Sequence, residues 1–290
     1  MNNSCFGVVV CIIFAILKFT AMSRYKLVVT VVISMMYVTF VRGAPDTLRH
    51  PSSDFVLLAT DYHHIGMLHG CSAAAPFLPY SQVTTTFENR FLLKELMREE
   101  IGAVFRYKNH AFLFNVSHFG YSLYGEMNLS AGYARTFGQH FSVGLNLHYL
   151  MTHAESACTL HSLTFDVSFY GRINRKFGMA FSCYNPARLK YGLTGKSYLP
   201  VRFLFELSYR ISDQLLIYTE IEKELKTAFD FSAGAVWRLR CLFLSLSAGF
   251  PNPWVKCGVE IQQKRFLFGV NCQYRLTTGV VPQAELAILF

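Results

Sequence analysis

The sequence has 290 residues, of which 52% are hydrophobic, 16% are aromatic and only 16% are charged. That charged fraction is well below the usual quarter of a soluble domain, yet no apolar run beyond the N-terminus reaches the roughly 18 residues of a membrane-spanning helix. The net charge of +9 falls to +5 without residues 1–43, and the basic residues are scattered singly or in pairs, so the sequence predicts no nucleic-acid partner.

Two apolar runs follow one another at the N-terminus, FGVVVCIIFAILKF and LVVTVVISMMYVTF. The second has a basic flank, about 14 apolar residues and small residues at a cleavage site, which is the anatomy of an export signal. We therefore interpret residues 1–43 as an N-terminal signal region that is cleaved after Gly43, with Met22 as a candidate true translation start. The alternative is a pair of N-terminal transmembrane helices.

Residues 44–81 separate this region from the first predicted strand. They contain four soft metal-ligand types at close spacing, His63, His64, His69 and Cys71, which are weak candidates for a zinc site. The spacing fits no recognised zinc finger, and the favoured interpretation is that these are polar side chains of a plug that face a wet interior. We therefore predict no metal and no other cofactor.

From residue 82 to the C-terminus, apolar residues recur at every second position, which is the period of a β-strand. Most of the predicted strands are longer than the 5 or 6 residues that are typical of soluble proteins, and their length suits a tilted strand that crosses a bilayer. Fourteen strands are predicted, at residues 82–91, 99–108, 110–121, 125–137, 140–153, 160–173, 176–186, 199–211, 214–224, 228–238, 240–249, 254–263, 265–275 and 281–290.

The connections between these strands alternate between short and long. Tight polar links such as YKNH, FGQH and QKR follow the even-numbered strands, and mostly longer links such as NPARLKYGLTGKSYL follow the odd-numbered ones. This alternation is typical of a transmembrane up-and-down antiparallel β-barrel with short periplasmic turns and longer outer loops. We predict such an all-β barrel over residues 82–290; the alternative is a secreted soluble β-sheet binding protein.

A barrel of about eight strands is filled by its own side chains, and one of sixteen to eighteen leaves an aqueous channel. Fourteen strands fall between, so the lumen is too wide for side chains alone to fill and needs a plug if it is not to leak. We therefore expect residues 44–81 to be a periplasmic plug segment that folds into the barrel. Polar side chains in the inward register are the candidates to line the lumen: Asn146, His148, Arg202, Glu206, Glu220, Asp230, Arg238, Glu260, Asn271, Gln273 and Glu285.

Some of these charges suggest ion pairs that stiffen the wall, and we expect Arg202 to pair with Glu206 and Arg238 with Asp230. The alternative is that these inward charges tune the selectivity of the lumen. The adjacent Glu99 and Glu100 are expected in an outer loop, pointing in opposite directions.

A catalytic site has weak support in the sequence. A triad of Ser142, His148 and Asp166 has no nucleophile elbow or other local motif to support it. No phosphate loop, dinucleotide fingerprint or metalloprotease motif is present. We therefore predict no enzymatic activity.

Several stretches resemble the PorV/PorQ-like outer-membrane proteins of Bacteroidetes, which are related in architecture to the FadL transporters of hydrophobic compounds. The stretches are FENRFLLKEL, SHFGYSLYGEMNLSAGYARTFG, FSVGLNLHYL, LPVRFLFELSYRISDQLLIYTEIEKEL, SAGFPNP and GVVPQAELAILF, and they run through nearly all of residues 82–290. The resemblance implies a 14-stranded barrel in the bacterial outer membrane. The segment at residues 44–80 departs from the family pattern, because it lacks the usual asparagine-proline turn before the first strand.

Two functions follow from this resemblance. The chain either binds or passes a hydrophobic small molecule, or belongs to type IX secretion and binds exported client proteins. The expected partners are outer-membrane lipid, the barrel-assembly machinery, and either such a small molecule or secretion-system proteins. The sequence ends at Phe290 in the outward register, and outer-membrane barrels resemble one another in such a final aromatic residue, which implies an assembly signal.

Overall fold

The computed structural model describes residues 71–290 except 156, 175, 191–197, 226 and 277–278. The predicted signal region, its cleavage site and most of the predicted plug therefore lie outside the described residues. Within the described part of the chain, no helix is long and apolar enough to cross a membrane.

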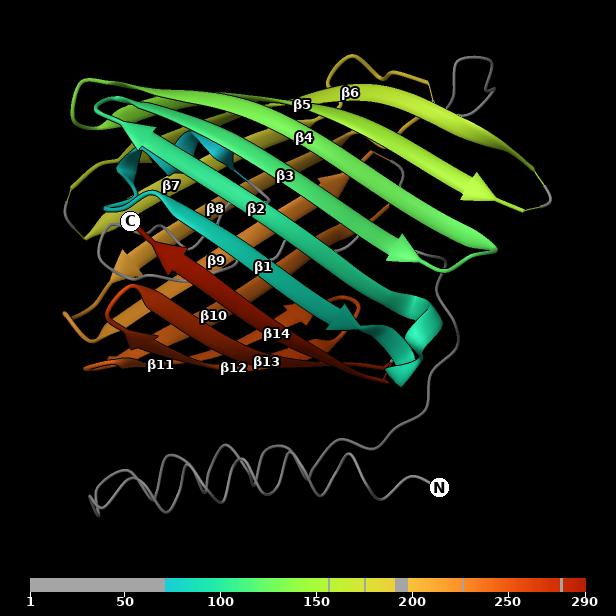
Figure 1. The fold of residues 1–290 in the computed structure, drawn as a ribbon. Helices are drawn as coiled ribbons and strands as arrows, with labels where there is room; N and C mark the ends of the chain where they lie inside the picture. Colours follow the sequence, from blue (N-terminus) through green and yellow to red (C-terminus); the bar gives the residue numbers. More distant parts are fainter. Residues whose placement is uncertain (1–70, 156, 175, 191–197, 226, 277–278) are drawn as a thin grey trace, which may run out of the picture. The chain divides into compact units, whose positions relative to one another are not determined.

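Fourteen antiparallel strands form a closed barrel in which each strand pairs with its neighbours in the sequence and β1 pairs with β14 (Figure 1). The strands are β1 (Gln82–Asn89), β2 (Met97–Tyr107), β3 (His110–Gly120), β4 (Tyr124–Phe137), β5 (Phe141–Ala154), β6 (Ala157–Arg172), β7 (Phe177–Tyr184), β8 (Arg202–Arg210), β9 (Leu215–Glu224), β10 (Phe229–Leu239), β11 (Leu242–Phe250), β12 (Trp254–Gln263), β13 (Phe266–Arg275) and β14 (Gly279–Leu289). Three short 3-10 helices accompany them: η1 (Ser72–Phe77), η2 (Arg90–Leu92) and η3 (Lys94–Leu96).

The predicted fold class is confirmed, and each predicted strand overlaps an observed one. The largest departures are at two strand starts. β8 begins at Arg202, three residues later than predicted, because Leu199 is engaged outside the sheet and the following Pro200 has no N–H for a ladder bond. β6 begins at Ala157, three residues early, beyond a register shift in its pairing with β5. Glu99 and Glu100 are part of β2, so their placement in an outer loop was wrong.

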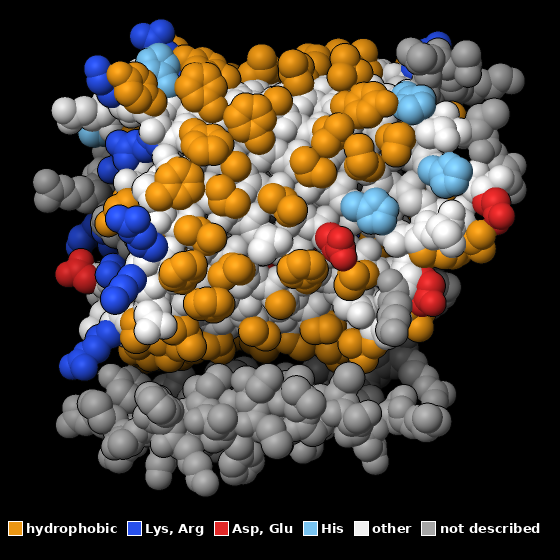
Figure 2. Space-filling view, viewed as in Figure 1, with side chains coloured by type: hydrophobic (Ala, Val, Ile, Leu, Met, Phe, Trp, Pro, Cys, Tyr) orange, Lys and Arg blue, Asp and Glu red, His pale blue; other side chains and the backbone are white. Residues whose placement is uncertain are grey.

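The wall has two chemically different faces because side chains alternate along each strand. On β3, Phe112, Phe114 and Val116 are exposed on the outside, whereas Ala111 and Leu113 are buried on the inside. Figure 2 shows hydrophobic side chains spread over the outer surface of the barrel between its two ends. With both faces of the sheet specified by a period of two, a slip of one residue in register would turn apolar side chains inward and polar ones outward.

The short connections lie together at one end of the barrel, which we call the short-turn end (left in Figure 1). Three of them are two-residue turns between consecutive strands, and Lys108, Arg240 and Lys264 take a positive φ in them. The C-terminus lies at the same end, where the backbone amides and carbonyls of Ser81 and Phe290 exchange hydrogen bonds of 3.0 and 3.1 Å. These bonds continue the β1–β14 pairing to the rim and complete the barrel seam.

Candidate functional site

A short segment of the chain lies inside the barrel near the short-turn end. It comprises Cys71–Leu78 and includes helix η1 (SAAAPF), and we call it the luminal segment. Its small side chains are almost fully buried. Because alanine, serine and proline occupy little volume, the backbone of the segment can approach the wall closely.

Side-chain hydroxyls of the wall bind the backbone of the luminal segment directly. The Oγ of Ser168 on β6 accepts a hydrogen bond of 3.0 Å from the backbone N–H of Ala73 and lies 2.8 Å from the Oγ of Ser72. The Oγ of Ser142 on β5 donates to the carbonyl of Ala73. These contacts satisfy backbone groups that burial would otherwise leave unpaired.

Gly144 leaves the space that the luminal segment occupies. A Cβ atom at this position would lie 2.3 Å from the Oγ of Ser72 and 2.6 Å from the backbone nitrogen of Ala73. Contacts this short do not occur between a Cβ atom and a backbone atom, so the segment would have to move. Glycine at position 144 is therefore required for the observed docking.

The far end of the luminal segment rests on aromatic and basic side chains. Phe77 packs edge-on against Tyr170 with ring centroids 4.9 Å apart, and the guanidinium of Arg172 stands 4.8 Å above the Phe77 ring. The guanidinium of Arg106 donates to the carbonyl of Leu78. The segment thus bridges β2 and β6 inside the barrel.

Apolar side chains from most of the wall meet the luminal segment at this end. They form one buried cluster, which we call the apolar floor: Ala75, Leu78, Val104, Ala111, Leu113, Ala134, Leu216, Tyr218, Val236, Phe243, Leu267 and Ala287. The floor joins strands on opposite sides of the barrel through the luminal segment. The lumen at the short-turn end is therefore packed with side chains.

Burial raises the pKa of the Cys71 thiol to about 12, and the negative charge of Glu206 adds to the effect. Because only the thiolate reacts with maleimides, we expect Cys71 to label far more slowly at pH 8 than the exposed Cys241. Peptide mapping after labelling checks this, and equal labelling of the two cysteines would contradict the docked position of the segment.

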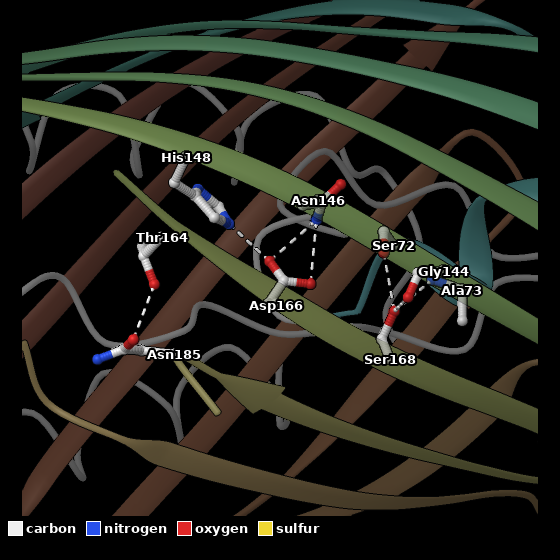
Figure 3. A network of polar contacts seen from close by, with 9 residues as sticks. All are labelled: Ser72, Ala73, Gly144, Asn146, His148, Thr164, Asp166, Ser168 and Asn185. Atoms are coloured by element: carbon white, nitrogen blue, oxygen red, sulfur yellow. Dashed lines mark hydrogen bonds and ion pairs between the residues drawn. The ribbon is translucent and has the colours of Figure 1, made fainter. Parts of the chain in front are cut away.

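A polar network lies next to the luminal segment on the same wall (Figure 3). The carboxylate of Asp166 on β6 accepts hydrogen bonds from Asn146 Nδ2, at 3.1 and 3.3 Å, and lies 2.6 Å from His148 Nε2. The ring of His148 also meets Tyr184 edge-on, with centroids 5.4 Å apart. Hydrogen-bonding groups of β5 and β6 thus face the interior next to the luminal segment.

Asn185 fixes the connection between β7 and β8 to the wall. Its Nδ2 donates to the carbonyl of Leu199 at 2.9 Å, while its Oδ1 accepts from the backbone N–H of Leu189 at 2.8 Å and from Thr164 Oγ1 at 3.1 Å. Asn185 is fully buried and has a φ of 53°, a conformation that asparagine tolerates better than most residues. One side chain therefore holds both ends of the connection.

Replacing Asn185 with alanine is expected to release this connection. About three hydrogen bonds are lost at roughly 1 kcal/mol each, so cleavage by trypsin after the exposed Arg188 and Lys190 should become at least about tenfold faster. The matched control is Asn174→Ala, which removes a similar cap from a tight turn at the other end of the barrel. Equal cleavage in wild type and Asn185→Ala would show that the anchor is not needed.

Three consecutive inward positions of β6 connect these features. Thr164 binds the Asn185 anchor, Asp166 carries the polar network, and Ser168 binds the luminal segment (Figure 3). We call this row the β6 ladder. It places the loop anchor and the luminal segment on one rigid strand, about 13 Å apart at the usual strand rise.

The predicted lumen-lining residues are distributed around the whole barrel. Asn146, Glu206, Glu220, Glu260, Asn271, Gln273 and Glu285 are buried, and His148, Arg202, Asp230 and Arg238 are partly buried. Only some of them meet. Asn146 and His148 share Asp166, and Glu206 pairs in register with Glu220. Glu260 and Glu285 both pair in register with Gly269, and Asn271 and Gln273 stand two residues apart on β13.

The two expected ion pairs are wrong. Arg202 bonds to Glu222 at 3.1 Å instead of Glu206, and its guanidinium lies 5.8 Å from the Tyr184 ring. Arg238 and Asp230 lie eight residues apart on one strand, which separates them by about 26 Å. Partners across a sheet are set by register, and the sequence spacing alone does not reveal them.

The other predicted chemical sites are not assembled in the described residues. His63, His64 and His69 lie outside them, Cys71 is enclosed in the luminal segment, and no group of three or more potential metal ligands occurs in the part of the chain that is described. His148 and Asp166 are paired, but the hydroxyl of Ser142 is turned to Ala73, so the three do not form a triad.

Sequence reasoning missed the residues that dock the luminal segment and anchor the loop. They are Ser72, Gly144, Thr164, Ser168 and Asn185. Asn185 had a usable signal, because an asparagine-proline pair marks a turn. The small polar residues of the wall had no such signal in the sequence, since the alternation along a strand shows only that they face inward.

No family model matches the sequence, and no curated protein matches it. Among solved structures, the barrel is similar to the toluene transporter TbuX of Ralstonia pickettii, with a TM-score of 0.59 and 9% identity over 78% of this chain and 94% of that chain. It is also similar to the monoaromatic hydrocarbon channel CymD, with a TM-score of 0.55 and 9% identity over 73% of this chain and 88% of that chain. At this identity the likeness is one of fold.

Proposed function

We propose that this chain is a bacterial outer-membrane β-barrel that passes a small molecule through its lumen, with the luminal segment as an internal stopper. The observation that carries the proposal is the docking of Cys71–Leu78 against Ser142, Gly144 and Ser168 inside a closed barrel. A barrel that served only as a scaffold would not need such an internal closure.

The outer surface supports the membrane location. Outward side chains such as Ile101, Leu163 and Val270 are 57–61% exposed. In a soluble protein, contact between so many apolar side chains and water would be energetically unfavourable. In a bilayer these side chains would contact lipid, and the closed sheet would leave no unpaired strand edge.

The substrate class that we propose is a small, largely apolar molecule. The buried side chains of the apolar floor make this part of the barrel interior hydrophobic, and the Asp166 network on β5 and β6 offers hydrogen bonds to a polar group. The similarity of fold to a toluene transporter and a monoaromatic hydrocarbon channel supports the same class.

Uptake of toluene into cells or liposomes that contain the full chain tests this function. We expect faster entry of toluene than in vesicles without the protein, and no comparable gain for a hydrophilic sugar of similar size. Equal entry of toluene with and without the inserted barrel would refute the proposal. Equal gains for both solutes would indicate a general pore and contradict a route specific for hydrophobic molecules.

A second candidate function is the binding of exported client proteins, as the resemblance to the PorV/PorQ-like family implies. Exposed apolar side chains in or beside the connections at the long-loop end favour it, among them Leu93, Leu123, Leu225 and Phe250. In a deletion strain, loss of secreted cargo with normal hydrocarbon uptake would support client binding, and the opposite result would support transport.

A further inference from the structure

The barrel gathers basic residues that the sequence disperses. Exposed lysine and arginine side chains occur in or beside five of the six short connections. Among the described residues of these turns, one acidic side chain is exposed, that of Asp213. Figure 2 shows blue side chains along this edge of the outer surface. The exposed bases, which we call the basic rim, are Lys108, Arg135, Lys176, Arg240, Lys264 and Arg265.

The opposite end of the barrel has no such excess. Its exposed charges in the described residues are mixed and comprise Glu95, Glu99, Glu155, Arg188 and Lys190. The basic rim is therefore a property of the short-turn end and does not follow from the overall positive charge of the chain.

Three of the rim cations occupy strained backbone positions. Lys108, Arg240 and Lys264 have φ values of 52°, 56° and 55°. Glycine and asparagine adopt this left-handed conformation with less strain than lysine or arginine. Turn geometry therefore does not explain why cations occupy these positions. A role for their positive charge explains it.

Aromatic side chains hold some of the rim cations at the edge of the apolar surface. The Lys108 ammonium lies 5.4 Å from the centroid of the Tyr107 ring, and the Arg135 guanidinium lies 5.6 Å from that of Phe137. Tyr107 and Phe137 are themselves exposed on the outward face. Aromatic rings at the border of an apolar band mark the depth of lipid headgroups, so these cations stand at that depth.

We propose that the basic rim binds the anionic phosphates of phospholipid headgroups in the leaflet at the short-turn end, which is the periplasmic leaflet of an outer-membrane barrel. The proposal rests on the membrane location in the proposed function, but it does not depend on transport. Lysine and arginine attract anionic lipid when they stand near the bilayer surface. Bases distributed around the circumference suit a ring of boundary lipids better than one compact protein partner.

Lipid selectivity of the inserted full-length protein tests this inference. The protein is placed in phosphatidylcholine vesicles with a trace of spin-labelled phosphatidylglycerol or phosphatidylcholine, and the motionally restricted lipid is measured. We expect about a threefold or greater preference for phosphatidylglycerol, which falls clearly in the variant Arg240→Gln/Lys264→Gln/Arg265→Gln, because this variant removes three of the six rim cations. The control Arg188→Gln/Lys190→Gln removes two cations from the other end and should keep the preference.

The outcomes separate this inference from the function on which it rests. A wild-type chain that neither floats with vesicles nor shows a heat-dependent shift in electrophoresis overturns the membrane location and the rim assignment together. A chain that inserts without lipid preference, or a rim variant that keeps the preference, overturns the rim assignment alone. Replacing chloride with inorganic phosphate at equal ionic strength should change nothing, and specific displacement of lipid by phosphate would overturn the assignment to headgroups.

Discussion

Replacing Gly144 with valine is expected to open the barrel to small ions. The new side chain displaces the luminal segment, because its Cβ would stand 2.3 Å from Ser72 Oγ and 2.6 Å from the Ala73 nitrogen. Loss of about two hydrogen bonds at roughly 1 kcal/mol each shifts the docked population by a factor of about ten or more. Single-channel conductance in planar bilayers measures the change.

The control for this substitution is Gly171→Val, at the short-turn end of the adjacent strand. A Cβ at Gly171 meets Met179 at an ordinary distance of 3.5 Å and touches nothing in the luminal segment. The control should conduct like the wild type. Maleimide labelling of Cys71 should rise in Gly144→Val and stay slow in Gly171→Val. If conductance stays at the wild-type level while Cys71 becomes reactive, the segment is displaced but is not the barrier to ions.

Deleting Phe290 is expected to reduce the yield of folded barrel. The deletion removes both backbone hydrogen bonds with Ser81 and the packing of its ring against Phe105, whose centroid lies 5.9 Å away. These losses weaken the β1–β14 seam by about 2–3 kcal/mol. The fraction of protein that shifts in heat-dependent electrophoresis measures the effect, both in cells and after refolding into detergent.

Two variants separate seam closure from the assembly signal that the resemblance implies. Phe290→Ala retains the backbone bonds, so it should refold into detergent nearly as well as wild type yet assemble poorly in cells. Phe250→Ala removes an exposed aromatic from the opposite end of the barrel and should affect neither measurement. If Phe290→Ala assembles normally in cells, the aromatic ring is not the signal.

The barrel was predictable because its determinants are local. A period of two sets the face of each residue, and the alternation of tight polar turns with longer loops sets the order of strands. The starts of β6 and β8 were not predictable to the residue, since a register shift and the engagement of Leu199 with Leu189 decide them.

The site was predictable only as a set of inward-facing residues. The pattern placed Asn146 and His148 on the inner face, but it could not show that Asp166 joins them or that Arg202 meets Glu222. Such contacts depend on how neighbouring strands are staggered. The role of Gly144 depends on a segment more than sixty residues away that returns to the same wall. The basic rim was hidden for a similar reason, since hairpin spacing separates its members along the chain.

The alternation along β6 has a consequence for how such a protein diversifies. Thr164, Asp166 and Ser168 bind interior elements, while the intervening Leu163 and Phe169 are exposed on the outer face. Because no position contributes to both faces, the interior can accumulate substitutions that change the lining of the lumen without altering the apolar outer surface. A duplicated copy of the gene would therefore acquire a new interior lining through changes at every second codon of a few strands.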